Sequence, residues 1–277
     1  MVAAIPVQMA LRDAFLAAGL GCLLCLIYSG LRFVLGQSAV ALAFSDVFCC
    51  ISGVLMLRSA AAVSYTHLVK AGLSLLQNTD RPGLAALISQ CGLEGKELTA
   101  ENVSFGLAPR LNAAGRMDSA TVALRLLLSD DEEEATLLAQ ELDDKNAARQ
   151  KAEQEISQIV LEQLTADPTY QSDRILVAWG DGFHPGVIGI VASRIAERMG
   201  KPAIIISVDE NGEGKGSGRS QEGISLYEAI ASCEQLLIRF GGHASAAGLS
   251  IRRENLPAFR KAINLWAAAH HPVVRCV

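Results

Sequence analysis

The stretch FHPGVIGIVASRIAERMGKPAIIIS (Phe183–Ser207) decides the fold. Its first part has apolar residues at helical spacing, with Pro185 suited to a first helical turn and Gly200 suited to the end of the helix. Its last part is a short run rich in isoleucine, which is typical of a buried strand. A helix that leads directly into a buried strand indicates an α/β domain.

Strands and helices continue to alternate on both sides of this stretch. Further strands are expected at Arg174–Trp179 and Ser245–Ile251, further helices at Ser225–Cys233 and Glu254–His270, and a glycine-rich strand or loop at Gly214–Ser220. Such alternation places a sheet beneath covering helices. We therefore predict an α/β fold for residues 170–270, with a mixed sheet covered by helices.

The segment before this domain is predicted to form one long helix. Ser129 is expected to be its N-cap, Glu132 completes a capping box, and the acidic run Asp130–Glu134 complements the positive end of the helix. Apolar residues at helical spacing continue to Leu164, which gives a length of about 50 Å. Because that is long for a domain interior, we expect residues 129–165 to connect two lobes.

The first 67 residues differ in composition from the rest of the chain. The sequence holds 24 basic and 29 acidic side chains, but only five of them fall within residues 1–67. Ala14–Leu31 is free of charge, and the span from about Ala39 to Leu57 carries only Asp46. A transmembrane helix needs roughly 17–25 mostly apolar residues. We expect an N-terminal apolar helical hairpin here, either as two membrane helices or as a buried pair.

This region also carries a second pattern and a possible junction. LIYSGLRFVLG (Leu26–Gly36), followed by FSDVFCCISGVLML (Phe44–Leu57), faintly resembles the YabQ-type sporulation membrane proteins. The next segment, AVSYTHL (Ala62–Leu68), resembles a string that arises when library adapter sequence is translated inside an assembled genome. We therefore expect Ala62–Leu68 to join two unrelated fragments, in which case the membrane segment is foreign to the rest.

The charge and the cysteines of the whole chain narrow the classes of function. The net charge of −5 argues against non-specific adhesion to polyanions, so a nucleic-acid ligand would need a local basic or amide-lined groove. The seven cysteines show no disulfide or zinc pattern, since Cys22 and Cys25 lie among apolar residues without a histidine at ligand spacing. This usage suits a reducing compartment.

Three polar, glycine-rich segments carry the candidate functional residues. The first, FGLAPRLNAAGRMDS (Phe105–Ser119), brings Arg110, Asn112 and Arg116 together in a short stretch. Its structural alternative is a loop before a helix, with arginines that pair with the acidic runs. The residues alone leave both interpretations open.

The second segment, GKGSGRS (Gly214–Ser220), has residue types that bind phosphate. Glycines can adopt positive φ, and successive N–H groups can then form an anion nest. Ser217 adds a hydroxyl donor, and Arg219 adds a planar fork suited to bidentate phosphate contact. The alternative is a hairpin turn, because glycine-rich loops are common.

The third segment, RFGGHASAAGL (Arg239–Leu249), combines glycines with one histidine. Gly241 and Gly242 permit a close approach of the backbone to a ligand, and His243 can donate to an oxyanion. A lone histidine is more often structural, but this one is framed by glycines and small residues. We interpret the segment as a binding site.

Together with VKAGLSLLQNTDRPGLAAL (Val69–Leu87), these segments resemble the RecJ single-strand-specific exonucleases of the DHH phosphoesterase superfamily. The resemblance runs from about Leu68 to Trp266. By it, residues 68–128 look like the C-terminal part of a DHH domain, residues 129–165 like the connecting helix, and residues 170–270 like the DHH-associated domain. Short helices are expected at Gly83–Gly92 and Ser119–Leu128.

The resemblance implies degradation of single-stranded DNA from a phosphorylated 5′ end, in DNA repair and recombination. It implies two divalent ions, Mn²⁺ or Mg²⁺, which activate water and stabilise the attacking and leaving oxygens. It also implies a cytoplasmic location, with a membrane location only if the N-terminal apolar segment is genuine.

The resemblance also implies roles for individual residues. Ser217 and Arg219 would hold the terminal 5′ phosphate. The DNA backbone beside the scissile bond would be contacted by Gly241, Gly242 and His243. The cleft between the lobes would be lined by four side chains: Arg110, Asn112, Arg116 and His184.

The sequence departs from this family at the metal centre. It contains no Asp-His-His motif, and His67 stands between Thr66 and Leu68. The acids before Asp80 are Asp13 and Asp46, both in the apolar front. No OB-fold segment is recognisable either. We therefore expect a fragment that keeps the phosphate- and strand-binding lobe and cannot itself hydrolyse DNA.

Two other functions remain open at this point. The first is a membrane-anchored cyclic-dinucleotide phosphodiesterase of the same superfamily, which the apolar front favours and the APRLNAAGRMDS segment (Ala108–Ser119) does not. The second is a non-catalytic nucleic-acid-binding module, which needs only the three polar segments. Phosphodiester substrates of different kinds would separate these possibilities.

Overall fold

The computed structural model describes residues 67–221 and 223–270, which fall into two compact units. The expected apolar hairpin and most of the expected junction at Ala62–Leu68 lie outside the described residues. Within the part that is described, no helix is long and apolar enough to cross a membrane.

The described part of the first unit is small. Residues 67–77 are helical, and the Leu98 backbone N–H donates to the Gln77 side chain at 3.2 Å. A single helical turn, α4 (Ala100–Asn102), follows a capping box in which Thr99 and Asn102 bond each other reciprocally. A short π-helical stretch, η1 (Val103–Leu107), then leads into the second unit.

A cluster of helices opens the second unit. Three helices pack against the first half of a much longer one, α7 (Glu132–Ala166). They are α3 (Pro82–Gln90), α5 (Ala108–Met117) and α6 (Thr121–Leu128). Leu87, Leu126 and Leu142 are fully buried between them. The helices expected at Gly83–Gly92 and Ser119–Leu128 are therefore present.

Helix α7 spans 35 residues, packs against the three helices with its first half and against the sheet domain with its second, and lies wholly within the second unit. Its expected role as a connection between two lobes stays a prediction. The predicted N-cap was wrong, because Asp131 and not Ser129 accepts from the Glu134 backbone, at 2.7 Å. Ser129 instead donates its hydroxyl to the Glu134 carboxylate at 2.9 Å. The second half of α7 carries Ile156 and Val160 into a core shared with the sheet.

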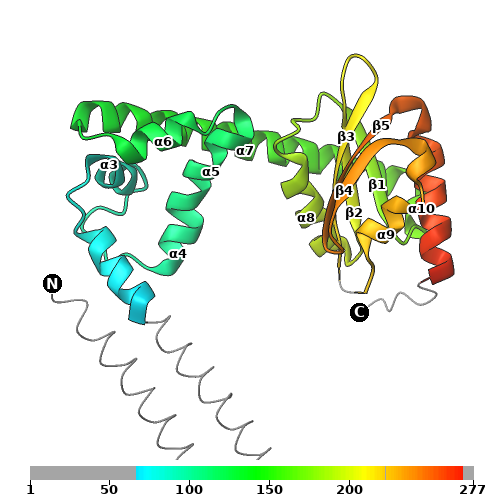
Figure 1. Ribbon diagram of the computed structural model, residues 1–277, viewed down its shortest axis with the longest axis horizontal. Helices are drawn as coiled ribbons and strands as arrows, with labels where there is room; N and C mark the ends of the chain where they lie inside the picture. The colour runs from blue at the N-terminus through cyan, green and yellow to red at the C-terminus, as the bar shows by residue number, and fades with distance from the viewer. Residues whose placement is uncertain (1–66, 222, 271–277) are drawn as a thin grey trace, which may run out of the picture. The chain divides into compact units, whose positions relative to one another are not determined.

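The described residues form a five-stranded mixed sheet in the order β1-β2-β3-β5-β4 (Figure 1). Its strands are β1 (Leu176–Asp181), β2 (Ala203–Val208), β3 (Glu213–Arg219), β4 (Leu237–Gly242) and β5 (Ala246–Arg252). The β1–β2 pair is parallel and the others are antiparallel. The predicted mixed α/β architecture is confirmed, although the sequence interpretation missed β4.

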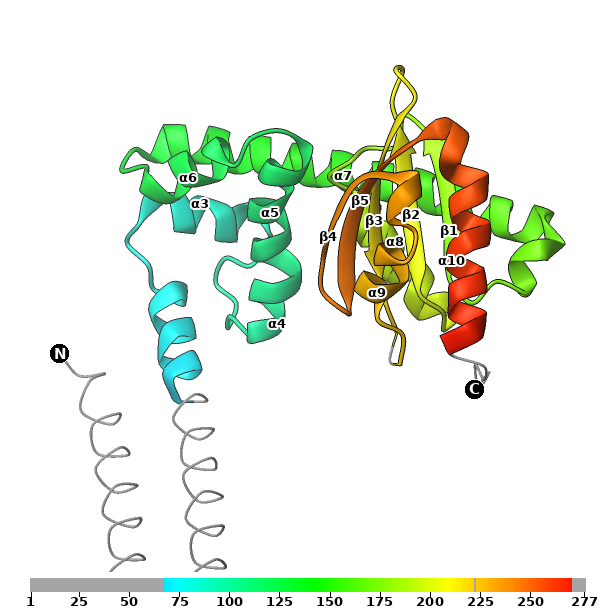
Figure 2. The ribbon, with the colours of Figure 1, turned by 45° about the vertical axis from the view of Figure 1, so that its right-hand side comes forward.

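Helices cover the two faces of this sheet unequally (Figure 2). One face packs on α9 (Leu226–Ala231) and α10 (Leu256–His270). The other packs on α8 (Ile188–Met199) and the second half of α7, chiefly over β1, β2 and β3. Short 3₁₀ turns join the elements: η2 (Pro168–Gln171), η3 (Glu234–Leu236) and η4 (Arg253–Asn255).

Helix α8 begins later than expected. Its first residue is Ile188, so Pro185 lies in the turn before the helix and not in its first turn. Gly200 ends the helix with a φ of 62°, in the left-handed region that glycine adopts without strain, as predicted. The late start leaves a short turn, His184–Val187, directly before the first residues of α8.

Candidate nucleic-acid interface

Strand β3 presents glycines on one face and polar side chains on the other. Its burial alternates, with Gly214 and Gly218 buried and Lys215 exposed. A Cβ on Gly216 would lie 2.9 Å from the Leu249 side chain and 3.1 Å from Ile206. The glycines therefore make room for aliphatic side chains of the α9/α10 core.

This arrangement corrects one prediction from the sequence. The anion nest expected at Gly214–Ser220 is wrong, because the segment is an extended strand and none of its glycines has a positive φ. As a central strand, β3 pairs with β2 on one side and β5 on the other. Its backbone N–H groups therefore serve the sheet, and the hairpin-turn alternative for this segment is wrong as well.

Ser217 and Arg219 lie on the polar face of β3 and meet the first turn of α8. Arg219 donates from Nη1 to Ser217 Oγ at 3.1 Å and to the Gly218 carbonyl at 2.8 Å. A Cβ on Gly189 would stand 3.0 Å from Ser217 Oγ and 3.2 Å from Arg219 Nη2. The absence of a side chain at Gly189 is thus what lets helix and strand approach here.

The same place carries the positive end of α8. Among the residues that the structure describes, nothing accepts a hydrogen bond from the Gly189 N–H. A helix N-terminus with a free N–H, a hydroxyl and a guanidinium is a favourable arrangement for an anion. We name Gly189, Ser217 and Arg219 the α8 anion site.

His184 begins the turn that leads into α8. Its Nδ1 accepts from the Gly186 N–H at 3.1 Å, and its carbonyl accepts from Val187 at 2.9 Å and from Ile188 at 3.2 Å. An acceptor Nδ1 places the proton of a neutral imidazole on Nε2. The half-buried His184 ring thus fixes the turn and keeps Nε2 as a donor.

Arg116 approaches this turn from the end of α5. Its Nη1 donates to the Gly186 carbonyl at 3.3 Å, and a Cβ on Gly186 would stand 2.0 Å from the Arg116 carbonyl oxygen. Only glycine fits at position 186. Arg116 and His184 are therefore brought to the same turn, next to the helix that forms the α8 anion site.

Arg110 and Asn112 occupy different settings. Arg110 Nε pairs with Asp143 of α7 at 2.7 Å, and its Nη1 donates to the Gly106 carbonyl at 2.9 Å. This pair ties α5 to α7, as the structural alternative for the first segment anticipated, although the segment is helical and not a loop. Asn112 lies exposed on α5, and its side chain has no hydrogen-bond partner among the described residues.

The two glycines at the end of β4 have different structural roles. Gly242 has a φ of 141°, and a Cβ there would stand 2.5 Å from the Ala246 carbonyl oxygen, so the turn itself demands glycine. Gly241 has nothing within 4 Å of a built Cβ and no positive φ. The His243 backbone N–H donates to Ala246 at 2.8 Å, and its side chain is exposed.

The sheet register brings the second and third segments together. Ser217 pairs with Gly248, and Gly248 with Gly241, in one row across β3, β5 and β4. These positions share the face that α8 borders, because their chain neighbours Ala247 and Leu249 belong to the opposite core. Gly189 was missed from the sequence, although a glycine inside a helical pattern was a usable signal.

A buried charge network fixes α8 against α7. Glu153 is 1% exposed and pairs with Arg149 of α7 at 2.9 Å and with Arg194 of α8 at 2.5 Å. Arg149 also donates to the buried Asn146 at 3.0 Å. Removing one partner of a buried pair leaves an uncompensated charge, so this network holds the helix that carries the anion site in place.

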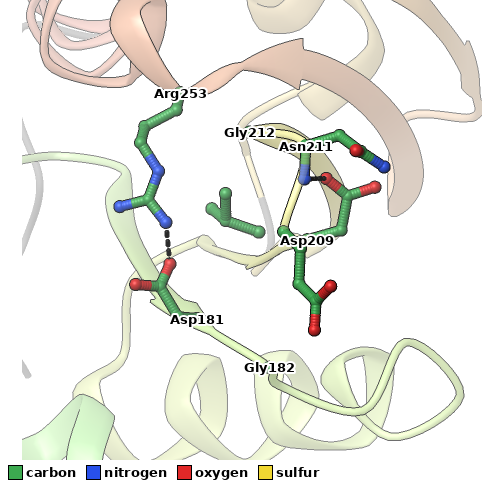
Figure 3. Close-up of a pocket in the computed structure, with 8 residues that line it drawn as sticks. Asp181, Gly182, Asp209, Asn211, Gly212 and Arg253 are labelled. Carbon is green, nitrogen blue, oxygen red and sulfur yellow. Dashed lines mark hydrogen bonds and ion pairs between the residues drawn. The ribbon is translucent and has the colours of Figure 1, made fainter.

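A hollow of about 670 Å³ lies at another edge of the domain, between β1, the β2–β3 turn and Arg253 (Figure 3). Arg253 pairs with Asp181, and the Asp209 side chain accepts from the Asn211 backbone at 2.9 Å. Its lining includes three acids, which oppose a polyanion, and none of the predicted site residues. Within residues 67–221 and 223–270, no group of three His, Cys, Asp or Glu side chains could hold a metal ion.

Comparison with known proteins agrees with this geometry. A family described as the DHHA1 domain matches residues 172–269. The exonuclease RecJ of Bacillus subtilis is 42% identical over 194 residues, covering 70% of this chain and 24% of its own length. RecJ of Escherichia coli is 38% identical over 190 residues, covering 65% of this chain and 32% of its own length.

A solved structure extends the similarity to the fold. RecJ of Thermus thermophilus in complex with Mg²⁺ matches with a TM-score of 0.66 and 40% identity, over 76% of this chain and 32% of that one. The matched part of the chain is similar to a segment of these RecJ proteins, and we call it the RecJ-type segment. The whole chain spans about a quarter to a third of the length of these curated relatives. The RecJ-type segment ends in the DHHA1 domain that carries β3, β4, β5 and α8.

Proposed function

We propose that the RecJ-type segment binds the 5′-phosphorylated end of single-stranded DNA, as the binding lobe of a 5′→3′ exonuclease that hydrolyses phosphodiester bonds. The observation that carries this proposal is the α8 anion site, where Ser217 Oγ and Arg219 Nη2 approach Gly189 within about 3 Å of its built Cβ. A terminal phosphate there accepts from the Gly189 N–H, the Ser217 hydroxyl and the guanidinium. Charge-assisted bonds of this kind are the stronger ones.

From the α8 anion site, the DNA strand would run across the row formed by Ser217, Gly248 and Gly241. Gly248 and Gly241 present no side chains on this face, so a sugar-phosphate backbone can lie against the sheet. His243, exposed after β4, can donate to a phosphate oxygen near the scissile bond. Contacts of this kind are to phosphates and not to bases, which suits an enzyme that is indifferent to sequence.

Residues of the first segment, Phe105–Ser119, lie close to the start of the proposed DNA path. Arg116 and His184 meet at the Gly186 turn, where their free donors can face a second phosphate oxygen. Arg110 acts as a positioning residue, because its pair with Asp143 holds α5 against α7. Asn112 is exposed and available to the DNA strand.

Hydrolysis in this family is expected to use Mn²⁺ or Mg²⁺, and related RecJ structures are described with each ion. The described residues of this chain do not fit such a centre, since no cluster of ligands exists among them. The full sequence also lacks an Asp-His-His motif. We therefore propose a DNA-binding role for this chain in repair or recombination in the cytoplasm, with no hydrolysis by the chain alone.

The test compares two DNA ends. Wild-type protein should bind a 5′-phosphorylated octathymidylate more tightly than the 5′-hydroxyl form at low salt, measured by fluorescence anisotropy. Arg219→Ala should remove that preference, because bonds to charged groups contribute about 1.5–3 kcal/mol, or roughly tenfold or more in Kd. Arg198→Ala, at the far end of α8, is the matched control and should leave the preference intact.

Other results would redirect the proposal. If Arg219→Ala left the preference for a 5′ phosphate unchanged, the α8 anion site would not hold the terminal phosphate. Manganese-dependent DNA hydrolysis by the purified chain, retained after removal of contaminating nuclease, would contradict the proposal that the chain alone does not hydrolyse DNA. Hydrolysis of a cyclic dinucleotide in preference to DNA would favour the phosphodiesterase alternative. DNA binding that does not depend on the 5′ phosphate would favour a simple nucleic-acid-binding module.

A further inference from the structure

The sheet face that carries Ser217 continues onto a second row of polar side chains. Lys215 of β3 pairs with Ser250 of β5, and Ser250 pairs with Arg239 of β4. These positions lie two residues from the Ser217–Gly248–Gly241 row on every strand, so they point to the same face. The row therefore has a cation at each end and a hydroxyl between them.

Arg239 is held in place but is not neutralised. Its Nε donates to Ser250 Oγ at 3.2 Å, and Ser250 is 3% exposed. This bond orients the guanidinium and leaves its two terminal nitrogens for a ligand. Within the described ranges, neither Arg239 nor Lys215 forms an ion pair with a carboxylate, and both residues are exposed.

The spacing of the two rows suits a nucleic-acid backbone. Two residues along a strand correspond to about 7 Å, which is on the scale of one nucleotide step in an extended single strand. Neighbouring strands are about 4.8 Å apart, so Lys215 and Arg239 flank Ser250 at roughly 10 Å from each other. Gly248 and Gly241 keep the space between the α8 anion site and this row free of side chains.

We propose that Lys215 and Arg239 form a second phosphate subsite, which binds an internucleotide phosphate while the α8 anion site binds the terminal one. The subsite deepens the proposed function and depends on it for the position of the 5′ end. Ser250 is a positioning residue, because it acts through the guanidinium of Arg239. Together the two sites fix the direction in which the strand crosses β3, β5 and β4.

The experiment uses the full chain and two ligands that differ in the number of phosphates. Thymidine 5′-monophosphate carries only a terminal phosphate, whereas a 5′-phosphorylated octathymidylate also carries internucleotide phosphates. Lys215→Ala and Arg239→Ala should each weaken octathymidylate binding about five- to tenfold and leave monophosphate binding unchanged. The slope of log affinity against log salt for the octathymidylate should fall by about 0.7 for each lost phosphate contact.

Controls separate this subsite from general charge effects. Lys151→Ala on α7 and Arg198→Ala at the end of α8 remove exposed cations elsewhere and should change neither ligand. Arg239→Lys should retain part of the affinity, because it keeps the charge and loses the bond to Ser250. Thermal unfolding of each variant verifies that the fold is intact.

Three outcomes decide the matter. Selective loss of octathymidylate binding in the two alanine variants supports the subsite. An equal loss of affinity for both ligands would place Lys215 and Arg239 at the terminal phosphate and overturn the proposal. Unchanged affinity for both ligands would show that these residues bind no phosphate, which would overturn it as well. Arg219→Ala serves as the separate check, because its failure to weaken the monophosphate would overturn the proposed function while the length-dependent comparison still stands.

Discussion

The two faces of the sheet in the RecJ-type segment are built from the same strands but differ in the side chains that they present. Toward α9 and α10, β3 offers glycines, and the neighbouring strands fill the space with Ile204, Ile206 and Leu249. Toward α8, the same strand offers Lys215, Ser217 and Arg219. Packing therefore governs one face, and the other carries the polar side chains of the proposed binding site, although the residues alternate within seven positions.

Substitutions at adjacent positions of β3 test whether the two faces have these different roles. Gly216→Val should destabilise the protein by about 1–3 kcal/mol, because its side chain would meet Leu249 and Ile206 in a filled core. Ser217→Ala, one residue along, should change stability little and weaken binding of the 5′ phosphate. Urea unfolding measures the first effect and anisotropy the second. A stable Gly216→Val that lost DNA binding would place ligand chemistry on both faces.

Gly189 offers a sharper test on the ligand face. Gly189→Ala favours the helix intrinsically, by up to about 1 kcal/mol. Its Cβ would nevertheless stand 3.0 Å from Ser217 Oγ and 3.2 Å from Arg219 Nη2, where the phosphate is expected. We expect a small net change in stability, because the close contact offsets the gain in helix propensity, together with roughly fivefold to tenfold weaker binding of a 5′-phosphorylated strand, or about 1–1.4 kcal/mol.

Gly115→Ala in α5 is the matched control for that experiment. A Cβ at this position meets only Ala120, at an ordinary 3.5 Å, and Gly115 is exposed. The substitution should therefore leave 5′-phosphate binding unchanged. If Gly189→Ala bound the phosphorylated end as tightly as wild type, the approach of α8 to Ser217 and Arg219 would have no role in phosphate recognition.

Much of the fold follows from local patterns in the sequence. Local sequence patterns predict three elements directly: the isoleucine run predicts β2, the amphipathic pattern ending at Gly200 predicts α8, and the long helical pattern predicts α7. Strand β4 did not, because it lies at the sheet edge and its residues are largely exposed, so no apolar run or clean alternation marks it. The cap of α7 was misplaced by two residues since Ser129, Asp130 and Asp131 are all acceptable N-caps.

The side chains of the candidate site could be proposed from the sequence, but their arrangement could not. Ser217 and Arg219 were chosen for their chemistry, whereas the role of the β3 glycines depends on which face each residue takes. That parity follows from pairing with β2 and β5, which lie at a distance in the sequence. A glycine inside a helical pattern marks Gly189 as unusual, but its closeness to Ser217 and Arg219 depends on the same long-range pairing.

The smallest effect concerns the α10 side of the domain and its dependence on pH. Arg260 of α10 pairs with Asp173 at 2.6 Å and with Asp167 at 3.0 Å. Hydrogen bonds from the Thr169 side chain and backbone, followed by that from Arg260, lower the pKa of Asp167 from 3.8 to about 2. The folded state therefore favours the carboxylate, and its stabilising contribution is complete above about pH 4.

This contribution should disappear as the pH falls from about 4 through about 2, where Asp167 becomes protonated in the folded state too. Urea midpoints measured across that range should fall less steeply for Asp167→Asn than for wild type. Asp130→Asn, at an exposed carboxylate before α7, is the matched control and should follow the wild-type curve. Because the hydrogen bonds of Asp167 go to Thr169 and to Arg260 of α10, and not to a proposed ligand residue, 5′-phosphate selectivity at neutral pH should be the same in all three proteins. A loss of selectivity in Asp167→Asn alone would mean that the α10 side supports the ligand face, and the separation of the two faces would then fail.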